Sequence, residues 1–174
     1  MRKNKSKYLT NNARQTQKLG ENFAKKIMQM PLSKKAVVVG LSGDLGSGKT
    51  TFLQGLARGF GIKEKILSPT FLIMKRFPLN NKKTKQRDDF YHIDCYRIKK
   101  FKDLLQLNIK EIIKNPRNII AIEWVDKIKK SMPLSSILVG FKFVGKNKRE
   151  ISFCHNAAKM VPLKNDRQKK TDYS

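Results

Sequence analysis

The sequence lacks any apolar run of the roughly 18 residues that a membrane-spanning helix needs. It also has only two cysteines, Cys95 and Cys154, and two histidines, which are too few for a disulfide framework or a zinc site. The basic N-terminus has neither the apolar stretch nor the small-residue cleavage site of a secretory signal. These absences argue against an integral membrane protein and a disulfide-rich secreted protein. We therefore expect a cytoplasmic protein with no membrane partner.

Acidic residues are scarce: 13 Asp and Glu stand against 39 Lys and Arg, and the formal net charge is +26. Such a charge favours RNA binding, because neutralising phosphates drives affinity without any reading of sequence. A generally basic, solvated surface is the competing explanation. It is favoured because 30 of the basic residues are Lys, spread from Lys3 to Lys170, as codons rich in A and T would produce. Charge alone does not decide the function.

Apolar periodicity predicts helices that alternate with strands. A helix is expected over 12–30, where Leu19, Phe23 and Ile27 share one face. The other predicted elements are strand 36–41, helix 51–60, strand 70–77, strand 90–96, helix 101–113, strand 118–124 and a hairpin of strands 137–144 and 150–154. This order indicates an α/β fold, with a mainly parallel sheet flanked by helices and a C-terminal β-hairpin.

The two ends of the chain differ in composition from its middle. Residues 1–9 are basic and aperiodic, which predicts a disordered N-terminus, and residues 159–174 read as a polar C-terminal tail. Residues 10–158 are expected to form one domain, which is long enough to bury a core. The sequence has no internal repeat.

Residues 43–50, GDLGSGKT, match the phosphate-binding pattern G-x-x-x-x-G-K-[ST] at every defined position. The segment follows an apolar strand and precedes a helix, which is the context that such a loop needs. Glycines let the backbone N–H groups point into a concave nest, and the helix N-terminus adds partial positive charge. Lys49 can then reach the β- and γ-phosphates, and the Thr50 hydroxyl can bind Mg²⁺. The pattern predicts a nucleotide site, and it makes the expected α/β fold P-loop NTPase-like.

Two acidic residues lie where a further Mg²⁺ ligand is expected, at the ends of predicted strands. Glu123 ends the apolar run 118–122, and Asp94 follows Phe90–Ile93. We predict that Glu123 binds the metal and that Asp94 orients the attacking water or completes the magnesium shell, and the two roles can be exchanged. The guanine-reading pattern N-K-x-D is absent, which favours ATP. Trp124 is either a core residue or an exposed aromatic residue near the nucleotide.

Several motifs together resemble the bacterial TsaE (YjeE) family over roughly residues 10–155. They are, in order, residues 43–51 (GDLGSGKTT), 68–71 (SPTF), 92–97 (HIDCYR) and 122–124 (IEW). The resemblance implies an ATPase required to form threonylcarbamoyladenosine at position 37 of tRNAs that read codons beginning with A. It also implies the protein partners TsaD and TsaB, whose complex ATP hydrolysis resets between turnovers. Contact with tRNA is then expected to be indirect.

The resemblance also implies roles for individual residues. Asp94 and Lys49 are implied to act in ATP hydrolysis, and Thr50 and Glu123 to hold Mg²⁺. The residues implied to bind ATP are Leu45, Gly46, Ser47, Gly48, Lys49, Thr50, Thr51, Thr70, Trp124 and Arg149. Thr70 belongs to a switch-like segment, 68–70, that is implied to lie near the γ-phosphate.

Two other classes of function stay open. A small-molecule or nucleotide kinase would use the same loop but needs an arginine-bearing lid, for which the loop 78–88 with Arg87 is the candidate. A basic RNA-binding protein with a vestigial nucleotide site is disfavoured by the intact GKT triplet and the two acids.

The sequence departs from the family pattern at one place. The predicted helix after Arg97 reads FKDLLQLN and lacks the acidic run usual in the TsaE family, so a partner contact through acidic side chains is not expected there.

Overall fold

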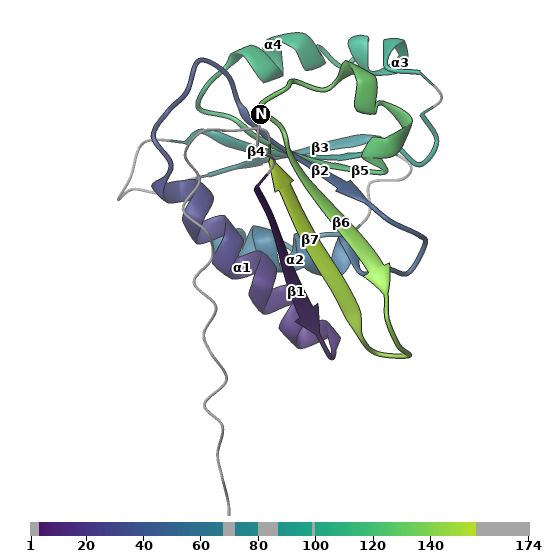
Figure 1. The fold of residues 1–174 in the computed structure, drawn as a ribbon. Coiled ribbons are helices and arrows are strands. Elements are labelled where there is room, and N and C mark those ends of the chain that lie inside the picture. The colour runs from purple at the N-terminus through teal and green to yellow at the C-terminus, as the bar shows by residue number, and fades with distance from the viewer. Residues whose placement is uncertain (1–3, 68–71, 80–86, 99, 156–174) are drawn as a thin grey trace, which may run out of the picture.

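A computed structural model describes residues 4–67, 72–79, 87–98 and 100–155. These residues form a seven-stranded sheet with the order β1-β7-β6-β2-β5-β4-β3 (Figure 1). The strands are β1 (Asn4–Thr10), β2 (Val37–Ser42), β3 (Met74–Pro78), β4 (Asp89–Asp94), β5 (Ile119–Glu123), β6 (Ile137–Phe143) and β7 (Arg149–His155). The helices are α1 (Ala13–Gln29), α2 (Lys49–Gly59), α3 (Lys102–Leu105) and α4 (Ile109–Lys114), with short 3-10 turns η1 (Val125–Lys127) and η2 (Lys129–Ser131).

The centre of the sheet is parallel. Strands β4, β5, β2 and β6 run in the same direction, with β7 and β3 antiparallel to their neighbours β6 and β4. The predicted mainly parallel α/β sheet with a C-terminal hairpin is therefore confirmed. Because parallel strands end at the same edge, the last residues of β2, β4 and β5 meet there.

Helices cover both faces of the sheet (Figure 1). Helices α1 and α2 pack on one face against residues such as Val39, Ala121 and Phe153. Helices α3 and α4 pack on the opposite face, where Ile120 and Ile122 belong to a second core. Successive residues of β5 thus alternate between two buried cores, which explains why the first four residues of this strand are all apolar. Among the described residues, no helix has the length and apolar character needed to span a membrane.

Helices α1 and α2 approach each other closely through glycines. A β-carbon added at Gly55 would lie 1.9 Å from the Gln17 carbonyl oxygen, and one at Gly20 would lie 2.3 Å from the Phe52 oxygen. Carbon atoms do not approach an oxygen this closely, so the helices can pack only where these side chains are missing. This contact holds α2, and therefore the phosphate-binding loop at its start, against α1.

We expect the Gly55→Ala variant to lose about 3 kcal/mol of unfolding free energy, because the new methyl group forces the α1 backbone away. Urea denaturation followed by circular dichroism measures this loss. Gly145→Ala is the matched control, since its β-carbon would lie 3.5 Å from Lys148 Cβ, an ordinary contact. The control should change stability by no more than about 0.5 kcal/mol. Equal stability of the two variants would contradict the close helix contact.

The N-terminal segment differs from the predicted disorder. Strand β1 pairs with β7 along its whole length, from Asn4 opposite His155 to Thr10 opposite Arg149. The Tyr8 ring packs edge-on against Phe153 with centroids 5.5 Å apart. A lysine-rich edge strand needs only backbone pairing and one buried face, and exposed lysines are common on such edges. Composition therefore gives a poor indication of order here.

The predicted helix 101–113 is divided in two. Asn108 has a φ of 54° and separates α3 from α4. This left-handed conformation interrupts a helix, and Asn adopts it more readily than most residues. Strand β3 occupies the later part of the predicted strand 70–77, while Thr70 and the predicted tail 159–174 lie outside the described residues.

Candidate nucleotide-binding site

The phosphate-binding loop connects β2 to α2 at the C-terminal edge of the parallel strands. Gly46 and Gly48 have φ angles of 73° and 102°, which side-chain-bearing residues rarely adopt. The loop therefore depends on glycine at these positions to form the predicted nest. Ser47 is fully buried, and its hydroxyl has no hydrogen-bond partner within the described part of the chain.

Lys49 is the first residue of α2 and is almost entirely buried. Its ammonium group donates hydrogen bonds to the carbonyl oxygens of Gly43 at 2.7 Å and Asp44 at 2.8 Å. It also lies 3.8 Å from the centre of the Trp124 ring. Burial lowers the pKa of Lys49, although the nearby carboxylates of Glu123 and Asp44 act in the opposite direction. The cation therefore sits inside the loop that is to receive phosphates.

Glu123 is held from two sides at the end of β5. The Thr50 hydroxyl donates to Glu123 Oε2 at 3.0 Å, and His92 Nε2 lies 2.9 Å from Glu123 Oε1. Both Glu123 and His92 are buried, with 2% and 0% of their surface exposed. In the sequence, His92 was singled out only as part of the motif 92–97, and its contact with Glu123 was not predicted. The available signal was its position two residues before Asp94, because such residues share one face of a strand.

Asp94 lies next to Glu123 at the strand ends. The two residues are register partners in the parallel β4–β5 pair. Asp94 Oδ1 accepts a hydrogen bond from the Tyr96 N–H at 2.8 Å, and the Asp94 N–H donates to the Ile73 oxygen at 2.9 Å. The structure thus brings together both predicted acids and the Thr50 hydroxyl.

One cavity of about 380 Å³ contains most of the predicted site. Its lining residues are Leu45, Gly46, Gly48, Lys49, Thr50, Thr51, Asp94, Tyr96, Glu123 and Trp124. Tyr96 was not predicted, and its ring lies 5.2 Å from that of Trp124. Trp124 is half-buried: it packs on the core beneath α3 and α4, and it also lines the cavity.

Arg149 lies on the other side of the loop. A second cavity, of about 360 Å³, shares Gly46, Gly48 and Thr51 with the first and is closed by residues of α1 and the hairpin. Its remaining lining residues are Asn12, Ala13, Thr16, Asn147 and Arg149. The Arg149 guanidinium lies 4.2 Å from the centre of the Phe143 ring, which holds it beside the loop. The phosphate-binding loop therefore separates an acidic cavity from one with amide and guanidinium groups.

Arg87, the candidate lid arginine of a kinase, is buried at the opposite edge of the sheet. Its guanidinium donates to the carbonyl oxygens of Pro116 at 2.7 Å and Met30 at 3.3 Å. These contacts lie before the first residues of β4 and β5, whereas the nucleotide site lies after their last residues. The structure gives Arg87 a structural role, and residues 80–86 of the loop lie outside the described part.

The donor set of the acidic cavity fits Mg²⁺. Thr50, Glu123 and Asp94 offer hydroxyl and carboxylate oxygens, the hard ligands that Mg²⁺ takes. Within the described ranges no cluster of three or more His, Cys, Asp or Glu could hold a metal by itself. Mg²⁺ usually binds through one or two carboxylates together with substrate phosphates and water.

Cys95 follows Asp94 and is buried, and burial raises the pKa of its thiol to about 12. The reactive thiolate is therefore negligible at about pH 8. We expect iodoacetamide to modify the half-buried Cys154 alone in the native protein, and both cysteines after denaturation. Mass spectrometry of peptides from each sample measures this, and native modification of Cys95 would contradict its burial.

Three comparisons with known proteins agree. The sequence profile of the family described as "Threonylcarbamoyl adenosine biosynthesis protein TsaE" matches residues 10–151. The tRNA threonylcarbamoyladenosine biosynthesis protein TsaE of Borreliella burgdorferi is 38% identical over 126 residues, which are 71% of this chain and 85% of that protein. The TsaE protein of Nostoc is 37% identical over 119 residues, covering 66% of this chain and 69% of that protein.

A solved structure extends the likeness from sequence to fold. The crystal structure of Bacillus subtilis YdiB superposes with a TM-score of 0.67 and 26% identity, covering 89% of this chain and 88% of that one. This chain therefore belongs to the TsaE family of tRNA threonylcarbamoyladenosine biosynthesis proteins.

Proposed function

We propose that this protein is a magnesium-dependent ATPase that acts with TsaD and TsaB to form threonylcarbamoyladenosine at position 37 of tRNAs reading codons that begin with A. The observation that carries the proposal is the Thr50–Glu123 pair, 3.0 Å apart, in one cavity with Lys49. A hydroxyl, a carboxylate and an ammonium group at a phosphate-binding loop form the set that phosphoryl transfer to water uses. The names of the relatives support the tRNA product.

The chain's own groups divide the work of hydrolysis between them. The Lys49 ammonium exchanges its two loop carbonyls for β- and γ-phosphate oxygens, and the loop N–H groups hold the remaining phosphate charge. Thr50 and Glu123 would hold Mg²⁺, which would supply neutralisation of the charge that develops on the phosphates. Asp94, the register partner of Glu123, orients the attacking water. His92 keeps the Glu123 carboxylate turned toward Thr50.

The base and ribose of ATP occupy the second cavity in this proposal. That cavity meets the first across Gly46, Gly48 and Thr51, so one ligand can cross the loop from one to the other. Asn12 and Asn147 line it with amide groups, which can donate to and accept from an adenine edge. Arg149 lines the same wall and is assigned to the nucleotide on this basis.

Thr70 is also assigned to the γ-phosphate side. It lies outside the described residues, but the segment that follows it is anchored at the site, because the Ile73 oxygen accepts the Asp94 N–H at 2.9 Å. Ile73 is three residues after Thr70, so the Thr70 hydroxyl is within reach of the cavity beside Asp94. The assignment otherwise follows the family motif SPT at residues 68–70.

The experiment that tests this function is ATP hydrolysis by the purified chain, with and without a purified TsaD–TsaB pair. We expect slow magnesium-dependent hydrolysis by the chain alone and severalfold stimulation by the pair, because positioning by partners completes a site that does little covalent chemistry. Stimulation should disappear in Lys49→Ala. Hydrolysis that is unaffected by the pair would contradict the proposal and favour a kinase.

A further inference from the structure

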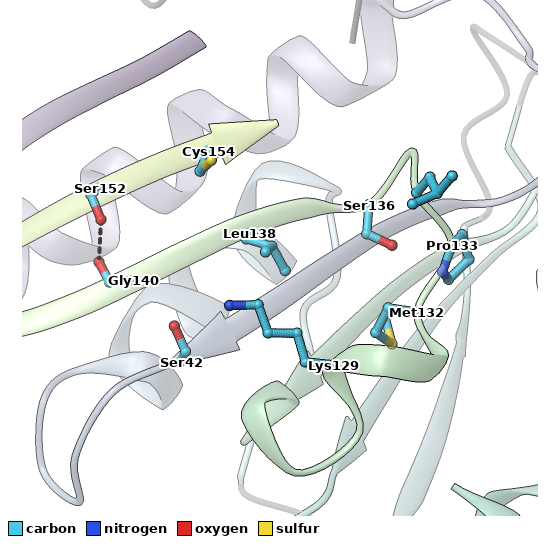
Figure 2. Close-up of a pocket in the computed structure, with 10 residues that line it drawn as sticks. Ser42, Lys129, Met132, Pro133, Ser136, Leu138, Gly140, Ser152 and Cys154 are labelled. Carbon is cyan, nitrogen blue, oxygen red and sulfur yellow. Dashed lines mark hydrogen bonds between the residues drawn. The ribbon is translucent and has the colours of Figure 1, made fainter. Parts of the chain in front are cut away.

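A groove separate from the nucleotide cavities lies on the face of β6 and β7 that points away from α1 and α2 (Figure 2). Its volume is about 580 Å³, and the loop that contains η2 borders it. Its lining residues are Ser42, Lys129, Met132, Pro133, Leu134, Ser136, Leu138, Gly140, Ser152 and Cys154. We call this the serine–lysine groove.

The floor of the groove contains a row of three small residues from adjacent strands. Ser42 pairs with Gly140 in the β2–β6 register, and Gly140 pairs with Ser152 in the β6–β7 register. A β-carbon at Gly140 would lie 3.0 Å from Ser152 Oγ and 3.7 Å from Ser42 Oγ. The missing side chain thus leaves a notch with a hydroxyl group on each side.

The groove contains a third hydroxyl group, that of Ser136, which lacks a hydrogen-bond partner among the described residues. Ser136 is 6% exposed, and its Oγ has no hydrogen bond within the described residues. Figure 2 shows this oxygen pointing toward the loop of Met132 and Pro133. A buried hydroxyl without a partner is costly, and a polar group bound in the groove would remove that cost.

The charge around the groove is positive. Lys129 reaches from the loop toward Ser42 (Figure 2). Lys130 is the next residue in the chain, Lys142 lies two residues after Gly140 in β6, and both are exposed. Among the described residues that line the groove there is no Asp or Glu. Glu150, the register partner of Lys142, forms a salt bridge with Lys7 at 3.0 Å. An anion is therefore the ligand that this surface complements.

We propose that the serine–lysine groove binds a phosphodiester group of the tRNA backbone, so that this chain contacts tRNA directly. The phosphate lies over the Gly140 notch, where Ser42 and Lys129 are donors. Ser152 becomes a third donor when its hydroxyl turns away from the Gly140 carbonyl oxygen, to which it donates at 3.5 Å. Met132 and Leu138 line the rest of the groove and pack against the attached ribose. The net charge of +26 supplies the long-range attraction that polyanions need. This proposal replaces the indirect tRNA contact that the resemblance implies. It rests on the proposed role of the protein in tRNA modification, but not on ATP hydrolysis.

Filter binding of tRNA to the full-length chain at several salt concentrations tests the groove. Lys129→Ala should weaken binding about tenfold and lower the salt slope by about 1, the loss of one phosphate contact. Gly140→Val, which fills the notch, should weaken binding similarly. Lys110→Ala, on the exposed surface of α4, is the matched control and should stay within about twofold of the parent. Groove variants that match the control would overturn the proposal.

Cys154 provides a second readout that does not require the Gly140 variant to fold. It lines the groove, so saturating tRNA should slow its alkylation by iodoacetamide severalfold, whereas MgATP should not. Alkylation unchanged by tRNA, or slowed equally by polyglutamate at the same charge concentration, would overturn the proposal, the latter in favour of an acidic protein segment. Lys49→Ala should keep full tRNA binding, so a failure of the ATPase assignment and a failure of this groove give different results.

Discussion

Lys49→Ala is expected to weaken MgATP binding by about 10- to 100-fold, the largest loss of affinity from a single side chain in this site. The Lys49 ammonium is buried inside the loop, and its present acceptors are only the two carbonyls of Gly43 and Asp44. Phosphate oxygens carry a full charge and so accept stronger hydrogen bonds from it. Removal of the ammonium leaves the phosphates without their one buried cation among the described cavity residues.

Trp124 offers a direct readout of this loss. It is the single tryptophan of the chain and lies 3.8 Å from Lys49 Nζ, so its emission reports on the cavity. Titration of MgATP gives the dissociation constant, and equilibrium dialysis with labelled ATP checks it, since the substitution itself alters the Trp124 surroundings. Lys110→Ala is the charge-matched control and should bind like the parent. Equal affinity in Lys49→Ala would place the phosphates elsewhere.

Glu123→Gln is expected to reduce ATP turnover by about 100- to 1000-fold while ATP affinity changes by less than about fivefold. The amide keeps the size of the carboxylate and can still accept from Thr50, so the fold is retained. It lacks the charge that holds Mg²⁺, and charge neutralisation on the phosphates supplies most of the catalysis in this chemistry. Single-turnover hydrolysis of labelled ATP measures the effect.

Magnesium titration separates the roles of the two acids. If Glu123 binds the metal, Glu123→Gln should require a higher magnesium concentration for half-maximal hydrolysis. Asp94→Asn should instead lower the maximal rate at an unchanged magnesium requirement, because it acts on the water. The reverse pattern would exchange the two assignments, and parent-like turnover in both variants would remove this site.

The geometry of the candidate site could be predicted from the sequence because its parts are local. The loop is a single run of eight residues, and its conformation needs glycine at the positive φ angles of Gly43, Gly46 and Gly48. Glu123 and Asp94 each follow an apolar strand, and parallel strands end together, so their proximity follows from the topology. The positions of these residues in the sequence were therefore enough to predict that they lie close together.

Other features depend on contacts between distant segments. Strand β1 is ordered by pairing with β7, from the other end of the domain, and no local signal indicates that partner. The contact of His92 with Glu123 depends on how two side chains turn at neighbouring strands. The serine–lysine groove needs β2, β6 and β7 side by side, since Ser42 and Ser152 meet only across Gly140. Such features require the register of the sheet.

The most direct test of the central claim is reconstituted tRNA modification with labelled threonine, in which this chain is added to or withheld from TsaD, TsaB and a supply of threonylcarbamoyl-adenylate. With the parent chain and MgATP, product should accumulate over many turnovers. Without it, or with Lys49→Ala, product should stop at about one group per TsaD–TsaB complex, as in a single-turnover reaction. Continued multiple turnover in the presence of Lys49→Ala would contradict the role of ATP hydrolysis by this protein.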